Sequence, residues 1–253
     1  MRARAFSLIE TIIATAVIVV LGACLAGAGW NVLKSSSLAV SASNLRQLTA
    51  GSCAYLAENN YTFWPYVSSD PDRPGRVWWF GFEPADSPAK EGERLLDPSG
   101  GPLGPYVPGG FLPDPSFRFS GKPFKPKFRF GYIGIGYNVR LGTGWLGKEK
   151  KKTYWELPDP GSIVVFSTSA QVNTFQAPAS AKNPMVEEFY GLSETDVTVH
   201  FRHNGKAMVG FANGSVGFLP MDESTRDMNA PKADIGRFAP RGSTKYLLPA
   251  TNN

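Results

Sequence analysis

MRARAFSLIETIIATAVIVVLGACLAGAGWNVLK, residues 1–34, is the stretch that decides the expected fold. Arg2 and Arg4 precede an apolar run from Thr11 to Leu33. A helix needs ~20 apolar residues to cross a bilayer, and this run is longer than the ~7–15-residue apolar core of an ordinary secretory signal. Because positively charged flanks stay on the cytoplasmic side, we expect a single-pass inner-membrane protein with a cytoplasmic N-terminus.

Glu10 places a carboxylate at the edge of this apolar run. A carboxylate costs on the order of 2.5–3.5 kcal/mol at the centre of a spanning helix, and less near its end. Opposite charges attract strongly in a low-dielectric surround, so a cationic partner would offset that cost. We therefore expect Glu10 to be paired. The alternative is a plain signal anchor in which Glu10 lies near the lipid headgroups.

The order of basic leader, Ala5-Phe6 junction, Glu10 and apolar run resembles precursors of the type IV pilin and type II secretion pseudopilin family. The resemblance implies that a prepilin peptidase cuts between Ala5 and Phe6 and that the new amine of Phe6 is methylated. It also implies that Glu10 neutralises the Phe6 amine of a neighbouring subunit during assembly. The family usually has glycine before the cut, where this chain has Ala5.

A second resemblance lies further along the chain, in Asn44-Leu45-Arg46-Gln47-Leu48 and in the stretch from His200 to Gly214. Both are similar to segments of a pilin-like subgroup abundant in planctomycete-type bacteria. A helix face packed on a sheet explains the leucines equally well, which leaves Asn44 as a candidate for a special contact. Asn213 stands where the subgroup usually has an acidic residue.

The resemblance and the residue pattern together predict a pilin-like α+β fold, with one long N-terminal helix packed on an antiparallel β-sheet. We expect a cleaved leader over 1–5, a transmembrane and assembly helix over 6–33, its continuation onto the globular domain over 34–60, and a β-rich periplasmic or extracellular domain over 61–253. Asn59-Asn60 supplies the helix stop. The apolar face of the continuing helix comprises Leu38, Ala42, Leu45, Leu48, Ser52 and Leu56.

The 27 glycines and 21 prolines favour strands and ordered loops after the helix. A Gly/Pro-rich surface insertion is expected over 97–127. Asn204-Gly205 and Asn213-Gly214 are strong hairpin signals, which predict an antiparallel meander in the last third of the chain. The expected strands cover residues 76–82, 128–139, 162–167, 195–201, 206–212 and 215–219.

His200 and His203 are the only histidines, and residues three apart on a strand point to opposite faces. We expect them to stabilise a turn rather than bind a metal. Cys24 and Cys53 would lie roughly 44 Å apart along one helix, too far for a disulfide. The net charge of +5 is spread along the chain, and the Lys148–Lys152 run is typical of a solvated loop.

The sequence has no serine, cysteine or lysine in a recognisable nucleophile setting and no recognisable pair of carboxylates. We therefore expect neither an enzyme nor a cofactor. The expected function is a structural subunit of a secretion pseudopilus or pilus-like filament. Its expected partners are the prepilin peptidase, other pilin or pseudopilin subunits and the inner membrane, with no nucleic acid. The alternative is a membrane-anchored adhesin or binding module.

Overall fold

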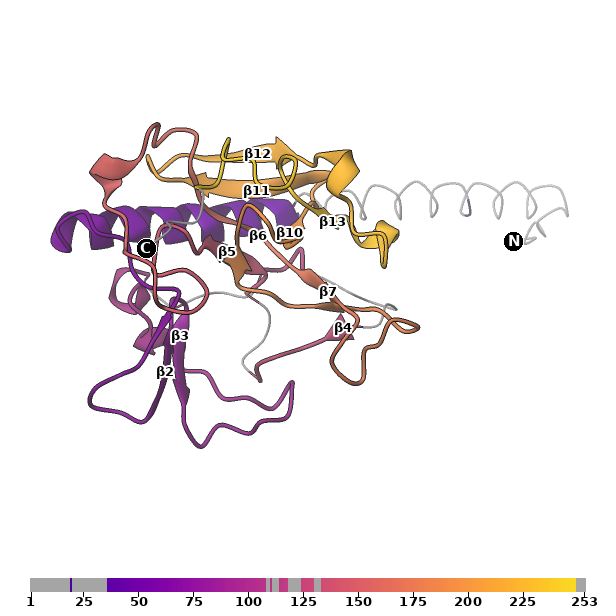
Figure 1. The fold of residues 1–253 in the computed structure, drawn as a ribbon, viewed down its shortest axis with the longest axis horizontal. Helices are drawn as coiled ribbons and strands as arrows, with labels where there is room; N and C mark the ends of the chain where they lie inside the picture. The colour runs from indigo at the N-terminus through magenta and orange to yellow at the C-terminus, as the bar shows by residue number, and fades with distance from the viewer. Residues whose placement is uncertain are drawn as a thin grey trace, which may run out of the picture. The chain divides into compact units, whose positions relative to one another are not determined.

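The computed structural model describes residue 19 and residues 36–107, 110, 114–117, 124–129 and 133–248. Contacts divide the chain into two units, Met1–Ala39 and Val40–Asn253. Of the first unit, the description covers only Val19 and residues 36–39. The elements of the second unit are shown in Figure 1.

The structure corrects the expected fold class and localisation. In the described part of the chain, residues 36–58 are helical, and no helix is both long enough and apolar enough to cross a membrane. Helix 36–58 carries polar side chains such as Ser43, Asn44 and Arg46, which an apolar span would exclude. The predictions of a membrane-spanning helix on one antiparallel sheet, and of a single-pass inner-membrane protein, are therefore wrong on this finding. The expected span over 6–33, apart from Val19, lies outside the described residues.

Helix 36–58 packs one face into the main hydrophobic core. Leu45, Leu48 and Leu56 are buried there together with aromatic residues, whereas Leu38 is exposed. Thr49 lies so close to Gly210 that a side chain at position 210 would collide with it. The predicted apolar face is thus confirmed for the three buried leucines, and the contact with Gly210 fixes the helix against a sheet.

In the part of the chain that the structure describes, short strands form four sheets instead of the single sheet expected. The largest has five strands in the order β12 (Val216–Pro220), β11 (Lys206–Phe211), β6 (Val164–Thr168), β5 (Ile135–Asn138) and β9 (Gly191–Leu192). A second has β1 (Val67–Ser68), β2 (Gly75–Trp78) and β3 (Gly81–Pro84). The third orders β4 (Phe124–Lys125), β8 (Met185–Glu187) and β7 (Gln171–Asn173), and the fourth pairs β10 (Val199–His200) with β13 (Ile235–Gly236).

Two of these strand pairs are parallel, which a meander would not produce. β5 pairs with β9, and β4 pairs with β8, both in parallel. Five short 3₁₀-helices connect the strands within the described residues: Pro98–Gly100, Gly104–Tyr106, Tyr154–Glu156, Glu223–Thr225 and Pro231–Ala233. Many strands have only two or three residues, so side-chain packing rather than long ladders holds the sheets together.

The aromatic stretch 76–82 forms a hairpin rather than the single strand expected. Strands β2 and β3 pair antiparallel, and Trp79 and Phe80 form the turn between them. Both turn side chains are fully buried in the core, where Trp79 donates a hydrogen bond to the carbonyl of Tyr190 at 2.8 Å. The turn carries large apolar residues because it points inward, so the usual Gly or Asn turn signal is missing.

The predicted meander is correct only in part. β11 and β12 pair antiparallel, and β11 also pairs with β6. The strand expected over 195–201 shrinks to β10, which leaves this sheet and pairs with β13. Asn204 and Gly205 both have positive φ, as a hairpin turn of this kind requires, whereas at Asn213-Gly214 only Gly214 does.

The region expected as an insertion over 97–127 contributes to the core where it is described. Leu103, Val107 and Phe117 are buried. A side chain at Gly101 would collide with the backbone of Gly81, with a Cβ only 2.6 Å from that nitrogen. Its glycines therefore permit close backbone packing, and the expectation of a surface insertion is wrong for these residues.

Candidate functional site

The three residues that the sequence singles out lie outside the described part of the chain. They are Ala5 and Phe6, at the expected processing bond, and Glu10, the expected assembly residue. Cys24 is outside it as well, and Cys53 is a free thiol whose pKa is raised by burial. The geometry that can be described begins at helix 36–58, whose residues from Val40 onward belong to the second unit.

The C-terminal end of this helix is built as the sequence predicts. The side chain of Asn59 donates a hydrogen bond to the carbonyl of Tyr55 at 2.8 Å, which satisfies one of the last helical acceptors. Asn60 and Tyr61 follow with φ of 52° and 55°. A left-handed tyrosine is uncommon, and its N–H donates to the carbonyl of Leu56 at 2.8 Å.

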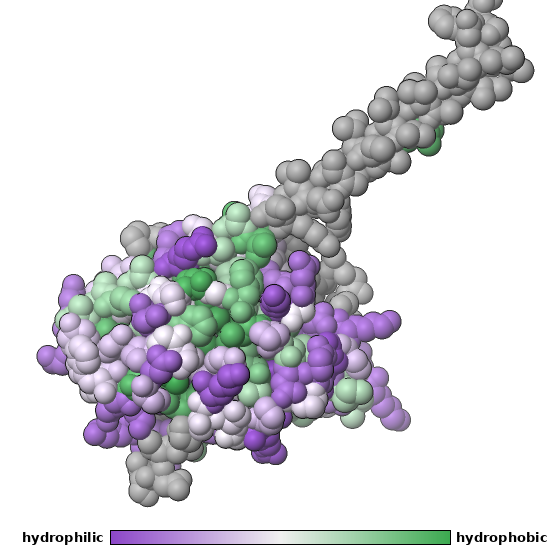
Figure 2. All heavy atoms as spheres, turned by 90° about the horizontal axis from the view of Figure 1, so that it is seen from above, coloured by the Kyte–Doolittle hydropathy of each residue, from purple (hydrophilic) through white to green (hydrophobic). Residues whose placement is uncertain are grey.

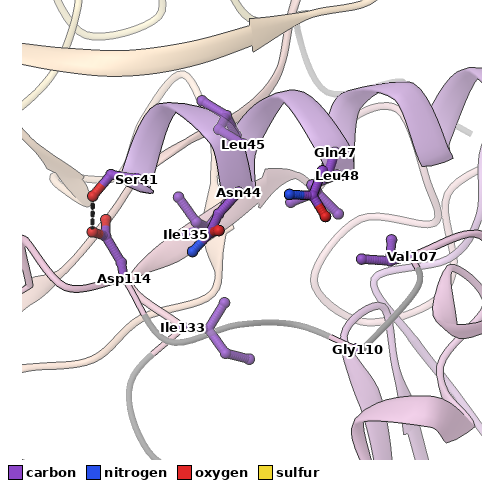
Figure 3. A pocket seen from close by; sticks show the side chains of 10 residues that line it. All are labelled: Ser41, Asn44, Leu45, Gln47, Leu48, Val107, Gly110, Asp114, Ile133 and Ile135. Atoms are coloured by element: carbon purple, nitrogen blue, oxygen red, sulfur yellow. Dashed lines mark hydrogen bonds between the residues drawn. The ribbon is translucent and has the colours of Figure 1, made fainter. Parts of the chain in front are cut away.

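A small pocket lies between the helix and the chain around Ile133 and Ile135. Figure 3 shows Asn44 pointing from the helix into this pocket. Its volume is about 30 Å³, which suits one water molecule rather than a substrate. Among the described residues the buried Nδ2 of Asn44 has no hydrogen-bond acceptor. The special contact expected of Asn44 is therefore not made with another described side chain.

A buried ion pair closes one end of this pocket. Asp114 pairs with Arg202, and their side chains are only 4% and 5% exposed. Ser41 of the helix donates a hydrogen bond to Asp114 at 2.5 Å, as Figure 3 shows. Burial opposes ionisation of Asp114, but the charge of Arg202 and the hydrogen bonds from Arg202, Ser116 and Ser41 outweigh it and lower its pKa. The pair thereby ties the helix to the chain beyond β10.

The histidines flank Arg202 and make different contacts. His200 is buried against the ring of Phe117, and its Nδ1 lies 3.2 Å from Arg202. His203 packs against Phe218 and pairs through its backbone with Lys206 across the Asn204-Gly205 turn. Burial and then the charge of Arg202 lower the pKa of both rings, to about 4 for His203. Both are neutral at ordinary pH, and His203 supports the turn through its backbone.

The outer face of the helix is exposed and mixes small side chains with the long side chains of Arg46, Gln47 and Glu58. Ser43, Ala50, Ala54 and Ala57 all face outward, and Val40 is 45% exposed. Figure 2 shows a second exposed feature, apolar side chains gathered among hydrophilic ones on the side of the molecule seen from above.

Two aromatic rings form an exposed pair beyond the end of the helix. Trp155 is 70% exposed and Tyr61 41% exposed, with ring centroids 4.8 Å apart. The backbone N–H of Tyr154 donates to the carbonyl of Tyr61 at 2.7 Å, and a capping box from Thr153 to Glu156 holds the short helix that carries Trp155. Rigid aromatic side chains exposed in this way are typical of contact surfaces.

Glu188 is a buried carboxylate to which the sequence analysis gave no role. It is fully buried, and its Oε1 accepts a hydrogen bond from the N–H of Ile133 at 2.6 Å. Burial raises its pKa to about 7, against the lowering effects of Tyr190, of two backbone N–H groups and of Lys127. No local pattern marks this residue, because its partner Ile133 lies 55 positions away in the chain.

Comparison with known proteins gives no relative. No protein-family model matches the chain, and no curated protein or solved structure matches it either.

Proposed function

We propose that this chain is a structural subunit of a type II secretion or type IV pilus-like filament, a pseudopilin or a minor pilin. The observation that carries the proposal is the order of features at the N-terminus: Arg2 and Arg4, the Ala5-Phe6 junction, Glu10 and the apolar run that follows. A basic leader, a cut before Phe and a glutamate at the fifth mature position belong together in that family.

Assembly in such a filament would bring the amine of Phe6 to Glu10 of a neighbouring subunit. Each charge would be costly alone in an apolar surround, and their pairing offsets that cost.

The test is mass spectrometry of the N-terminus of the protein purified from its native host. We expect the mature chain to begin at a methylated Phe6. An Ala5→Gly variant, which restores the residue usual in the family, should be cut at the same bond. Recovery of the assembled protein with an intact Met1 terminus would overturn the proposal.

A binding module or adhesin is a second candidate, favoured by the exposed pair of Tyr61 and Trp155. Aromatic side chains dominate many binding surfaces. A Trp155→Ala variant should then lose surface attachment of whole cells while its melting temperature stays unchanged. Phe175→Ala, at another exposed aromatic residue, is the matched control.

A further inference from the structure

The loop of residues 143–152 carries a cluster of lysines and turns its one acid inward. Its lysines are Lys148, Lys150, Lys151 and Lys152. The carboxylate of Glu149 lies 2.5 Å from the guanidinium of Arg140, whose side chain is only 10% exposed. Lys148, Lys150 and Lys151 are exposed. The solvent face of the loop is therefore positive, because the acid that would balance the lysines is bound by Arg140.

An exposed leucine lies in the same loop. Leu146 is 79% exposed, more than any other large apolar side chain among the described residues. Close to it on both sides, Gly144 and Gly147 have φ of 66° and 70°, which side chains rarely adopt, so the backbone turns sharply here. Trp145 anchors the loop, because its indole N–H donates a hydrogen bond to the carboxylate of Asp196 at 3.1 Å. The loop is thus held in place while Leu146 projects outward.

A hollow of about 520 Å³ opens beside this leucine. The residues that line it include two cations, Arg76 and Lys151, and two serines, Ser68 and Ser69. Glu83, the residue opposite Arg76 in the pairing of β2 with β3, is bound by Arg94 at 2.8 Å. Guanidinium, ammonium and hydroxyl groups all donate hydrogen bonds to phosphate oxygens. The hollow therefore suits an anionic phosphate headgroup.

We propose that loop 143–152 docks on an anionic membrane surface. Leu146 enters the interface of the bilayer, and the lysines and Arg76 face the phosphates of the lipid headgroups. Attraction to anionic lipids together with burial of apolar side chains holds peripheral proteins on bilayers. A soluble polyanion would contact the lysines but would leave Leu146 in water, so the leucine favours the membrane. The contact is one of the loop with the bilayer surface, and it does not depend on assembly into a filament.

The test is acetylation of the lysines of the full chain on vesicles, read at each lysine by mass spectrometry. One set of vesicles contains phosphatidylglycerol and phosphatidylcholine, and the other contains phosphatidylcholine alone. A lysine near an anionic surface strengthens binding by a factor of about five, so we expect Lys151 to be labelled at least about fivefold more slowly on the anionic vesicles. Lys182, an exposed lysine in another loop, should be labelled alike on both. Any attachment through residues 1–34 is common to both sets of vesicles.

A variant of the leucine separates a membrane from other anions. Leu146→Ser should lose most of the protection of Lys151 on anionic vesicles, because the apolar contribution is gone. Met228→Ser, at a methionine that is 76% exposed, should keep that protection and is the matched control. Both side chains are exposed, so the fold does not depend on either.

Three results would overturn the proposal. The first is equal labelling of wild-type Lys151 on the two kinds of vesicle. The second is protection that Leu146→Ser leaves intact, because a membrane contact needs the leucine. The third is protection of Lys151 by heparin, a soluble polyanion, without protection by the anionic vesicles.

Discussion

Asp114 and Glu188 are both buried carboxylates, yet their pKa values shift in opposite directions. Asp114 lies against the guanidinium of Arg202 and accepts hydrogen bonds from Ser41 and Ser116, which keep it ionised. Glu188 accepts backbone hydrogen bonds from Ile133 and Gly134 but has no guanidinium beside it among the described residues, and burial raises its pKa. A partner charge, rather than depth of burial, therefore decides whether an acid in this core is charged.

The largest effect should come from removing the partner of Asp114. Arg202→Met leaves a buried carboxylate without its charge partner and should destabilise the protein by about 3–5 kcal/mol in urea unfolding. The double variant Asp114→Leu with Arg202→Met should lose less than Arg202→Met alone, because no lone charge remains. Equal losses would show that the two residues do not act as a pair.

The pH dependence of the pair follows from the direction of the shift. The pKa of Asp114 is lowered on folding, so its contribution is present above the unfolded value of about 3.9 and is lost as pH falls toward the folded value. We expect the difference in unfolding free energy between wild type and Asp114→Asn to narrow in acid. A constant difference from about pH 6 to about pH 2 would contradict this account.

Glu188 should behave in the opposite way. Its pKa is raised to about 7, so the folded protein binds the extra proton and its stability declines as pH rises from about 4.5 to about 7. Wild type should lose about 2–3 kcal/mol between about pH 5 and pH 8 relative to Glu188→Gln, which cannot ionise. Parallel stability curves for the two proteins would show that Glu188 does not titrate in this range.

A smaller loss of stability is expected when a single hydrogen bond to Asp114 is removed. Ser41→Ala removes one donor to Asp114 and should cost about 0.5–1.5 kcal/mol in urea unfolding. Ser43→Ala is the matched control on the same helix, because Ser43 is exposed and accepts a hydrogen bond from Gln47. Equal losses for the two variants would assign the effect to helix propensity instead of Asp114.

The smallest expected effect is that of a chelator. His200 and His203 flank Arg202, whose positive charge disfavours a cation between them. The melting temperature of the full chain should therefore stay the same when EDTA is added. A fall of many degrees in the melting temperature would show that the chain binds a metal ion and would contradict this prediction.

Local signals predicted part of this fold. The Asn204-Gly205 turn, the helix stop at Asn59 and the buried leucines of helix 36–58 depend on neighbours in sequence. The turn at Trp79 and Phe80 escaped prediction because its residues are chosen for burial rather than for turn geometry. The pairing of β10 with β13 and the two parallel pairs join segments distant in sequence, so no local pattern indicates them.

The buried polar groups were beyond sequence analysis for the same reason. Arg202 reaches Asp114 across 88 positions, and Asn173 meets Glu187 only because β7 and β8 pair. From the sequence alone, a carboxylate such as that of Asp114 is expected to face solvent, because its partner lies far away in the chain. The N-terminal residues Ala5, Phe6 and Glu10 stand out in sequence alone, and their roles stay predictions because they lie outside the described residues.

The proposed function is tested most directly by comparing Glu10→Gln with wild type in a sheared filament fraction of the native host. Loss of the partner of the Phe6 amine should cost about 3–5 kcal/mol at each subunit contact. We therefore expect Glu10→Gln to be made and cut normally but to disappear from the filaments, while Glu93→Gln, at an exposed carboxylate, is recovered like wild type. Normal recovery of Glu10→Gln in the filaments would contradict the proposed function.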